Sequence, residues 1–140
     1  MEKLAIHLAL HGVVVLTVSV LAGLFLYRSI LKNKNKADWH LVHAGGSARG
    51  IMLIALAATI NLPALPLWLL SALVWLIIFF TWTSTLAMLI RAFTGEKGFN
   101  YIGPKANKLV YTLYAIGTIA IFPALLLLIF GLIKTLSMQP

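Results

Sequence analysis

Residues 65–90 read LPLWLLSALVWLIIFFTWTSTLAMLI and contain no charged side chain. A helix needs ~20 apolar residues to cross a hydrocarbon core of ~30 Å, because each residue advances the helix by about 1.5 Å. The stretch exceeds that length, and it lacks the alternation of apolar and polar residues that a membrane β-strand requires. It therefore predicts a transmembrane helix.

Three further runs have the same character, at residues 4–27, 41–60 and 109–133. Hydrophobic residues make up 61% of the 140 residues and charged residues 10%, whereas a soluble domain carries about 25% charged residues. The sequence predicts an all-α integral membrane protein, with one four-helix bundle domain over residues 1–140. The first run is longer than the apolar core of a signal peptide and no small-residue cleavage site follows it, so we expect it to be retained.

The loops after the first and third runs carry eight basic residues, and the loop after the second run carries none. The eight are Arg28, Lys32, Lys34, Lys36, Arg91, Lys97, Lys105 and Lys108. The positive-inside rule then predicts that both basic loops are cytoplasmic and both termini outside, in a bacterial inner membrane. Anionic lipid is the expected partner of these loops. Nucleic acid is not expected, because the basic residues are confined to loops without an aromatic platform.

The composition also excludes several kinds of chemistry. The chain has no cysteine, which removes disulfides, iron–sulfur clusters, thiolate-bound haem and cysteine nucleophiles. Its three acidic residues, Glu2, Asp38 and Glu96, lie near the ends of the runs, so paired-carboxylate hydrolysis lacks its parts. A small proton-coupled multidrug transporter depends on a glutamate inside its first span, and here that span holds none beyond Glu2.

The four histidines form two pairs. His7 and His11 lie four residues apart on one helical face, a spacing that suits two ligands of one metal, while His40 and His43 lie at the cytoplasmic start of the second run. An interfacial or capping role is the alternative for each pair. If the first two runs form an antiparallel pair, a residue of one run and a residue of the other lie at the same depth when their numbers sum to about 68. His11 is then level with residue 57 or so, ~20 Å along the helix from His43. The two cannot hold one iron within a subunit, so a haem with a single histidine ligand is favoured.

Five residues of the second run share one helical face: Trp39, His43, Gly46, Ser47 and Gly50. Beyond the imidazole this face has almost no side chains, so a macrocycle or another helix could lie flat on it. Glycines spaced by four are common where helices touch in lipid. Both interpretations are open from spacing alone.

The stretch from Trp39 to Gly50, WHLVHAGGSARG, resembles the signature that opens the second helix of the styrene oxide isomerase family. In that family a tryptophan precedes the haem-ligating histidine by four residues, and a glycine follows it by seven. Similar residues occur along the other three runs. They are His11, Gly12 and Gly23 in the first, Trp82 and Phe93 around the third, and Gly103 and Pro104 in the last loop.

The resemblance implies a function and an assembly. Members of the family are small four-helix membrane proteins that form trimers and bind haem b through one histidine, which makes His43 the expected axial and metal ligand. Trp39, Gly46, Ser47 and Gly50 are then candidate cofactor contacts. The iron acts as a Lewis acid on an epoxide oxygen, and the substrate rearranges to an aldehyde. A homotrimer, membrane lipid and a small apolar substrate are the implied partners.

Two departures from the family pattern bear on activity. The family has an asparagine six residues after the histidine and a tyrosine on the third helix, which together place the epoxide, and here those positions are Arg49 and Met88. They are therefore the candidate catalytic positions. An arginine at the bilayer centre costs ~3 kcal/mol or more unless it is paired. Arg49 either extends toward an interface or caps carbonyls of a neighbouring helix, or it pairs with a haem propionate or an anionic ligand.

Two function classes follow. The first is an isomerase that rearranges epoxides to aldehydes with ferric haem as Lewis acid, a reaction that needs no protein carboxylate. The second is a non-catalytic haem- or lipid-binding membrane subunit or assembly factor. A small transporter is a weaker third class, since the first span lacks the coupling acid.

Overall fold

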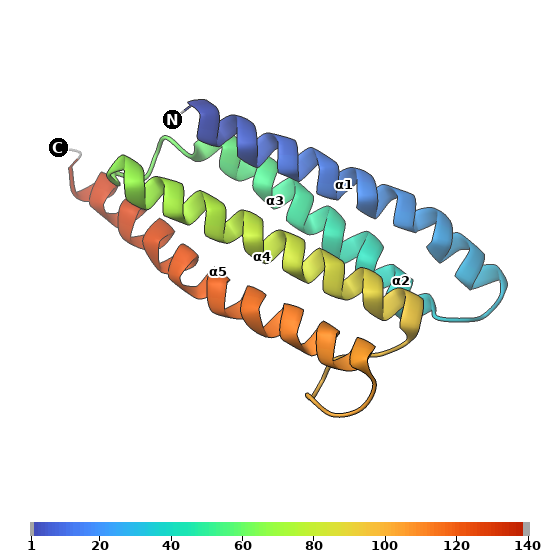
Figure 1. The fold of residues 1–140 in the computed structure, drawn as a ribbon. Helices are drawn as coiled ribbons and strands as arrows, with labels where there is room; N and C mark the ends of the chain where they lie inside the picture. Colours follow the sequence, from blue (N-terminus) through green and yellow to red (C-terminus); the bar gives the residue numbers. More distant parts are fainter. Residues whose placement is uncertain (1, 139–140) are drawn as a thin grey trace.

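The computed structural model describes residues 2–138, and every regular element in that range is helical. Helix α1 spans Glu2–Leu31, α2 spans Lys36–His40, α3 spans Gly46–Thr59, α4 spans Leu67–Thr94 and α5 spans Lys105–Ser137. A π-helical turn at Leu41–Gly45 joins α2 to α3, so Lys36–Thr59 forms one rod. The prediction of four helices long and apolar enough to span a membrane is confirmed (Figure 1).

Each helix extends beyond its predicted apolar run, chiefly at the end near the basic loops. Apolar composition marks only the part of a helix that suits lipid, whereas the backbone continues into polar turns until a residue stops it. Helix α4 ends at Gly95, which adopts φ 78°, the left-handed conformation common after a helix. In the following loop Gly103 has φ 100° and is followed by Pro104, the residue immediately before α5.

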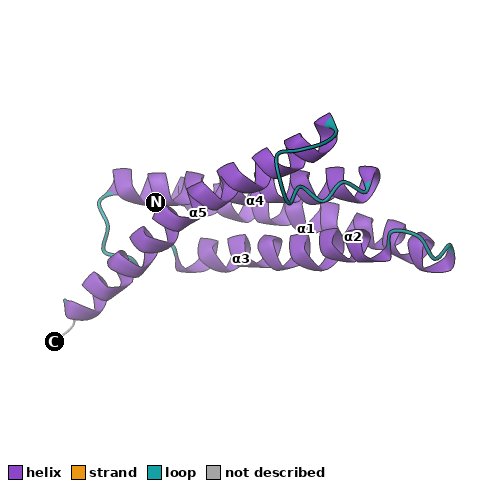
Figure 2. Cartoon of the chain, turned by 90° about the horizontal axis from the view of Figure 1, so that it is seen from below, coloured by secondary structure: helices purple, strands orange, loops and turns teal. Residues whose placement is uncertain are grey.

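The rods form two antiparallel hairpins, α1 with α2–α3 and α4 with α5 (Figures 1 and 2). Both chain ends lie at one end of the bundle and the two long loops at the other. Helix α4 touches both helices of the first hairpin, whereas among the described helices α5 packs only against α4, with further contacts to the loop at residues 62–65. The bundle is therefore open on the side of α5, where Ile119 and Leu126 are 71% and 67% exposed.

Glycines bring α1 and α3 into close contact. A Cβ atom on Gly50 would lie 2.8 Å from the carbonyl oxygen of Gly12, and a Cβ atom on Gly46 would collide with Ser19. Both α3 glycines are buried beneath α1. At Gly46 and Gly50 this face therefore packs against a neighbouring helix, which is one of the two interpretations that spacing alone left open.

Candidate functional site

The His43 side chain projects from the π-helical turn toward α1. Its Nδ1 atom lies 2.8 Å from the carbonyl oxygen of Ser19. Since a carbonyl oxygen only accepts hydrogen bonds, Nδ1 must carry the ring hydrogen, and Nε2 keeps its lone pair. Metal-binding histidines commonly hold their other ring N–H in this way. The single π turn is itself a feature that recurs at functional sites.

Gly23 makes room for the His43 ring on α1. A Cβ atom at this position would lie 3.2 Å from Nδ1 and 3.3 Å from Cε1 of His43, closer than nearly all natural contacts of this kind. The ring thus lies between Ser19 and Gly23, where the carbonyl fixes its orientation and the missing side chain permits its approach.

The surroundings of His43 fit one axial ligand of a haem. The ring is half-buried, so it reaches the subunit surface. Ser47 lies one turn further along α3 and is half-buried, and the neighbouring Ala44 and Ala48 are exposed. These side chains are small, so the surface of the second rod next to His43 is low. Among the small residues of the helical face described from the sequence, Ser47 is the one that α1 does not bury.

Trp39, one turn before His43, is buried in an aromatic cluster. Its ring stacks on Phe25 with centroids 4.7 Å apart and meets Phe93 edge-on at 4.9 Å. The cluster joins α1, α2 and α4 and lines a cavity of about 150 Å³. Trp39 therefore holds the start of the second rod in place, and contact with a cofactor stays a prediction for this residue.

An ion pair missed by the sequence analysis supports this end of the bundle. Arg91 Nε donates to Asp38 Oδ1 over 2.6 Å, and both side chains are largely buried. It is the only salt bridge among residues 2–138. The pair ties α2 to the last turns of α4 beside Trp39. In the sequence, the one sign of this pair was that Asp38 and Arg91 lie at the ends of two predicted helices that face the same side of the membrane.

The structure brings Arg49 and Met88 together. Arg49 Nη1 donates to the carbonyl oxygen of Gly45 over 2.9 Å and lies 3.5 Å from Sδ of Met88. The guanidinium carbon lies 5.5 Å from the centre of the Phe80 ring. Arg49 thus caps a carbonyl of its own rod, four residues earlier, rather than one of a neighbouring helix. The contacts with Met88 and Phe80 lie on α4, whereas His43 contacts α1. The side chains of Arg49 and His43 therefore project from different sides of the second rod.

The family model for styrene oxide isomerase matches residues 4–133, nearly the whole chain and all four spans. The chain belongs to the styrene oxide isomerase family. The resemblance seen in the sequence is therefore confirmed at the level of the family. No curated protein matched the chain when whole sequences were compared.

The half of this family member that holds the start of α1 has a second pair of histidines with different hydrogen bonding. Trp82 Nε1 donates to His11 Nδ1 over 3.0 Å, so a neutral His11 carries its hydrogen on Nε2, the opposite arrangement to His43. The ring of His7 lies 5.2 Å from that of Trp75. No group of three or more potential metal ligands occurs in the described part of the chain.

The separation of His11 from His43 is smaller than the sequence predicted. The depth rule used for the sequence placed His43 level with about residue 25 of the first helix. Its ring instead lies beside Ser19 and Gly23, which is nearer to His11. From residue 11 to residue 19 a helix still rises about 12 Å. The His11 ring accepts from Trp82 of α4, whereas the His43 ring contacts the backbone of α1, so the structure does not bring the two histidines together.

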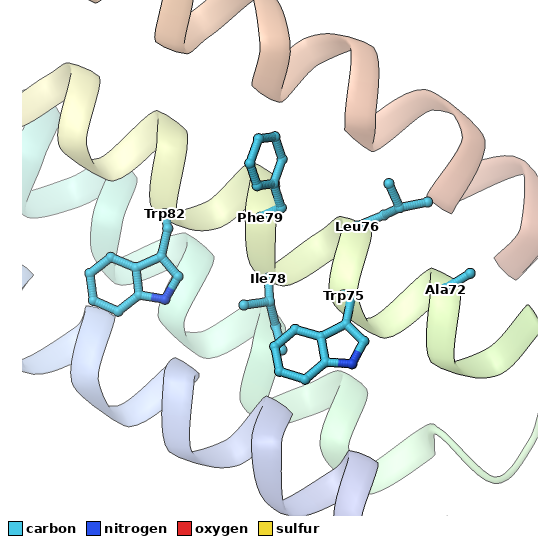
Figure 3. Close-up of a pocket in the computed structure, with 6 residues that line it drawn as sticks. All are labelled: Ala72, Trp75, Leu76, Ile78, Phe79 and Trp82. Carbon is cyan, nitrogen blue, oxygen red and sulfur yellow. The ribbon is translucent and has the colours of Figure 1, made fainter. Parts of the chain in front are cut away.

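An apolar groove lies on α4 (Figure 3), and two residues that line it, Trp75 and Trp82, contact His7 and His11. Its volume is about 640 Å³, within the range of ligand pockets. Trp75 and Trp82 point toward α1, and Phe79 points toward α5. The groove is lined by Ala72, Trp75, Leu76, Ile78, Phe79 and Trp82. Neither His43 nor Arg49 lines it, so this groove is separate from both predicted sites.

Proposed function

We propose that the protein is a membrane isomerase that binds haem b through His43 and rearranges a small apolar epoxide to an aldehyde. The observation that carries this proposal is the hydrogen bond from His43 Nδ1 to Ser19, which leaves Nε2 free on a helix of a styrene oxide isomerase family member. Haem, when bound, supplies a Lewis-acidic iron that polarises the epoxide oxygen.

The chain's own residues have three tasks in this function. The Ser19 carbonyl fixes the tautomer and orientation of His43 and makes its ring a better ligand. Gly23 leaves the space that the ring needs. The apolar helices deliver an apolar substrate through the membrane and exclude water that would hydrolyse an epoxide.

The site supports assembly as a homo-oligomer, which we take to be the trimer of the family. A haem has a surface of ~600 Å² or more, and ligand sites bury 70% or more of their ligand. His43 reaches the outside of the α1–α3 hairpin, and α5 leaves most of its apolar surface unpartnered. A second copy packed beside His43 would enclose the cofactor and bring its own Arg49–Met88 side within reach.

The membrane orientation follows from the charges. Both basic loops lie at one end of the bundle, and we propose that this end faces the cytoplasm of a bacterial inner membrane and contacts anionic lipid headgroups.

A non-catalytic haem-binding subunit is the second candidate. The observation that favours it is that Arg49 and Met88 contact one another at the two positions where the family orients its substrate.

The test begins with absorption spectra of the purified protein and three histidine variants. His43→Ala should lose the Soret band, while His11→Ala and the exposed neighbour His40→Ala keep it. Loss of the band to the same extent in His11→Ala would contradict a single ligand. Ferric protein is then given styrene oxide without reductant. Aldehyde formation supports the isomerase, and full haem binding without turnover supports the non-catalytic subunit.

A further inference from the structure

Arg49 is a permanent cation in the apolar interior without a protein counterion. The one ion pair in the described chain joins Asp38 to Arg91, and the other two acids, Glu2 and Glu96, lie at helix ends. The partners of Arg49 are a backbone carbonyl, a thioether and an aromatic face. Neutral groups of this kind cannot balance a full charge in lipid.

The unused donors of Arg49 have a defined geometry. Nη1 makes both hydrogen bonds of this side chain, while Nε is buried and has no partner among residues 2–138. Nε–H and the adjacent Nη2–H point in the same direction and form the fork that accepts a carboxylate side-on. A buried donor left without a partner is expensive, so a ligand that supplies oxygen atoms here is strongly favoured.

The space around the fork is adaptable. Gly45 makes room for the guanidinium, because a Cβ atom there would lie 3.1 Å from Nη1 and 3.2 Å from Met88 Sδ. Met88 is unbranched and flexible, so it can move to admit an oxygen atom. Tyr114 of α5 packs against the apolar cluster that contains Met88.

We propose that Arg49 binds the carboxylate of an apolar organic anion inside the bundle. Two sources have this chemistry, a lipid-soluble carboxylic acid and a haem propionate, and the second rests on the proposed function. A propionate from the same subunit's haem would have to pass from the α1 side to the α4 side, so it would come from a neighbouring copy.

The first arm of the test needs no bound haem. Phenylacetate and its neutral isostere phenylacetamide are titrated into the purified full-length protein in lipid nanodiscs by calorimetry. Wild type should bind the acid about tenfold or more tightly than the amide. Arg49→Gln should remove the preference, and Arg28→Gln, which removes an exposed charge at the end of α1, should keep it. Arg49→Lys tests the fork, since it retains charge without the paired donors.

The second arm separates the two sources. The protein is reconstituted with haem or with its dimethyl ester, in which both propionates are neutral. If a propionate is the ligand, the ester binds wild type about tenfold more weakly than haem, Arg49→Gln binds both equally, and haem-loaded protein loses its preference for phenylacetate. If a free acid is the ligand, haem and ester bind alike and the acid preference persists.

Equal binding of acid and amide together with equal binding of haem and ester to wild type would overturn the proposal. This outcome needs no variant, so it stands even if Arg49→Gln fails to fold. A protein that takes up no haem but prefers the acid would contradict the proposed function and still support a carboxylate site at Arg49.

Discussion

At the scale of single residues, two histidines of one chain show how the partner of one ring nitrogen sets the role of the other. Ser19 accepts from His43 and leaves a lone pair on its Nε2, whereas Trp82 donates to His11 and leaves a hydrogen on its Nε2. Spacing along the sequence made both pairs of histidines possible metal ligands. The partners, which come from other helices, distinguish them.

Gly23→Ala tests the space behind His43. The added methyl group would lie 3.2 Å from Nδ1, so the ring must turn away and weaken its bond to Ser19. We expect the rate of haem release to rise about tenfold or more, since partners of metal-bound histidines contribute 10–100-fold to affinity. Transfer of haem to excess apomyoglobin measures this rate. Leu24→Ala, at an exposed position of the same helix, is the control and should release haem at the wild-type rate.

Arg49→Asn combined with Met88→Tyr tests whether the two departures limit activity. The double change restores the family residues at positions that touch one another, and a positioning hydrogen bond is commonly worth ~100-fold in rate. We expect aldehyde formation from styrene oxide to rise about tenfold or more over wild type at matched haem content. Haem-loaded proteins that are both inactive would contradict a shared substrate site and favour a non-catalytic subunit.

At the scale of helices, the four apolar runs suffice to predict the fold, because length and composition alone decide whether a helix suits a membrane. The site was less predictable. The contacts of His43 with Ser19 and Gly23 depend on the register of α1 against the second rod, which close glycine contacts determine. The contact of Arg49 with Met88 likewise depends on how two hairpins meet. The pattern of residues within a single helix does not determine how that helix is aligned against its neighbours, so it predicts neither of these contacts.

Asp38→Asn tests the tie between α2 and α4. The substitution leaves the largely buried Arg91 without its counterion, and breaking such a pair costs about 3 kcal/mol or more. The melting temperature in detergent should fall, and Trp39 fluorescence should report a loosened aromatic cluster. In a double-mutant cycle, Arg91→Gln added to Asp38→Asn should cost much less than it does alone. Additive effects of the two substitutions would show that the pair contributes nothing as a pair.

At the scale of the whole molecule, one subunit lacks the walls that a haem site needs. His43 is half-buried, α5 packs against α4 alone among the described helices, and Arg49 contacts α4 on a different side of the second rod. Each of these features is explained if copies of the chain complete one another's sites, since a closed symmetric assembly would cover the open surfaces.

Haem retention should therefore depend on the oligomer. Detergents of increasing harshness are expected to release haem at the same concentration at which they separate the subunits, because the ligand loses the surface supplied by the neighbouring copy. Size-exclusion chromatography with light scattering and detection at the Soret wavelength measures both quantities on one sample. His43→Ala provides the control, since it should lose haem in every detergent, including those in which the oligomer persists. A monomer that elutes with one haem per chain would show that a single subunit completes the site and would remove the argument for assembly.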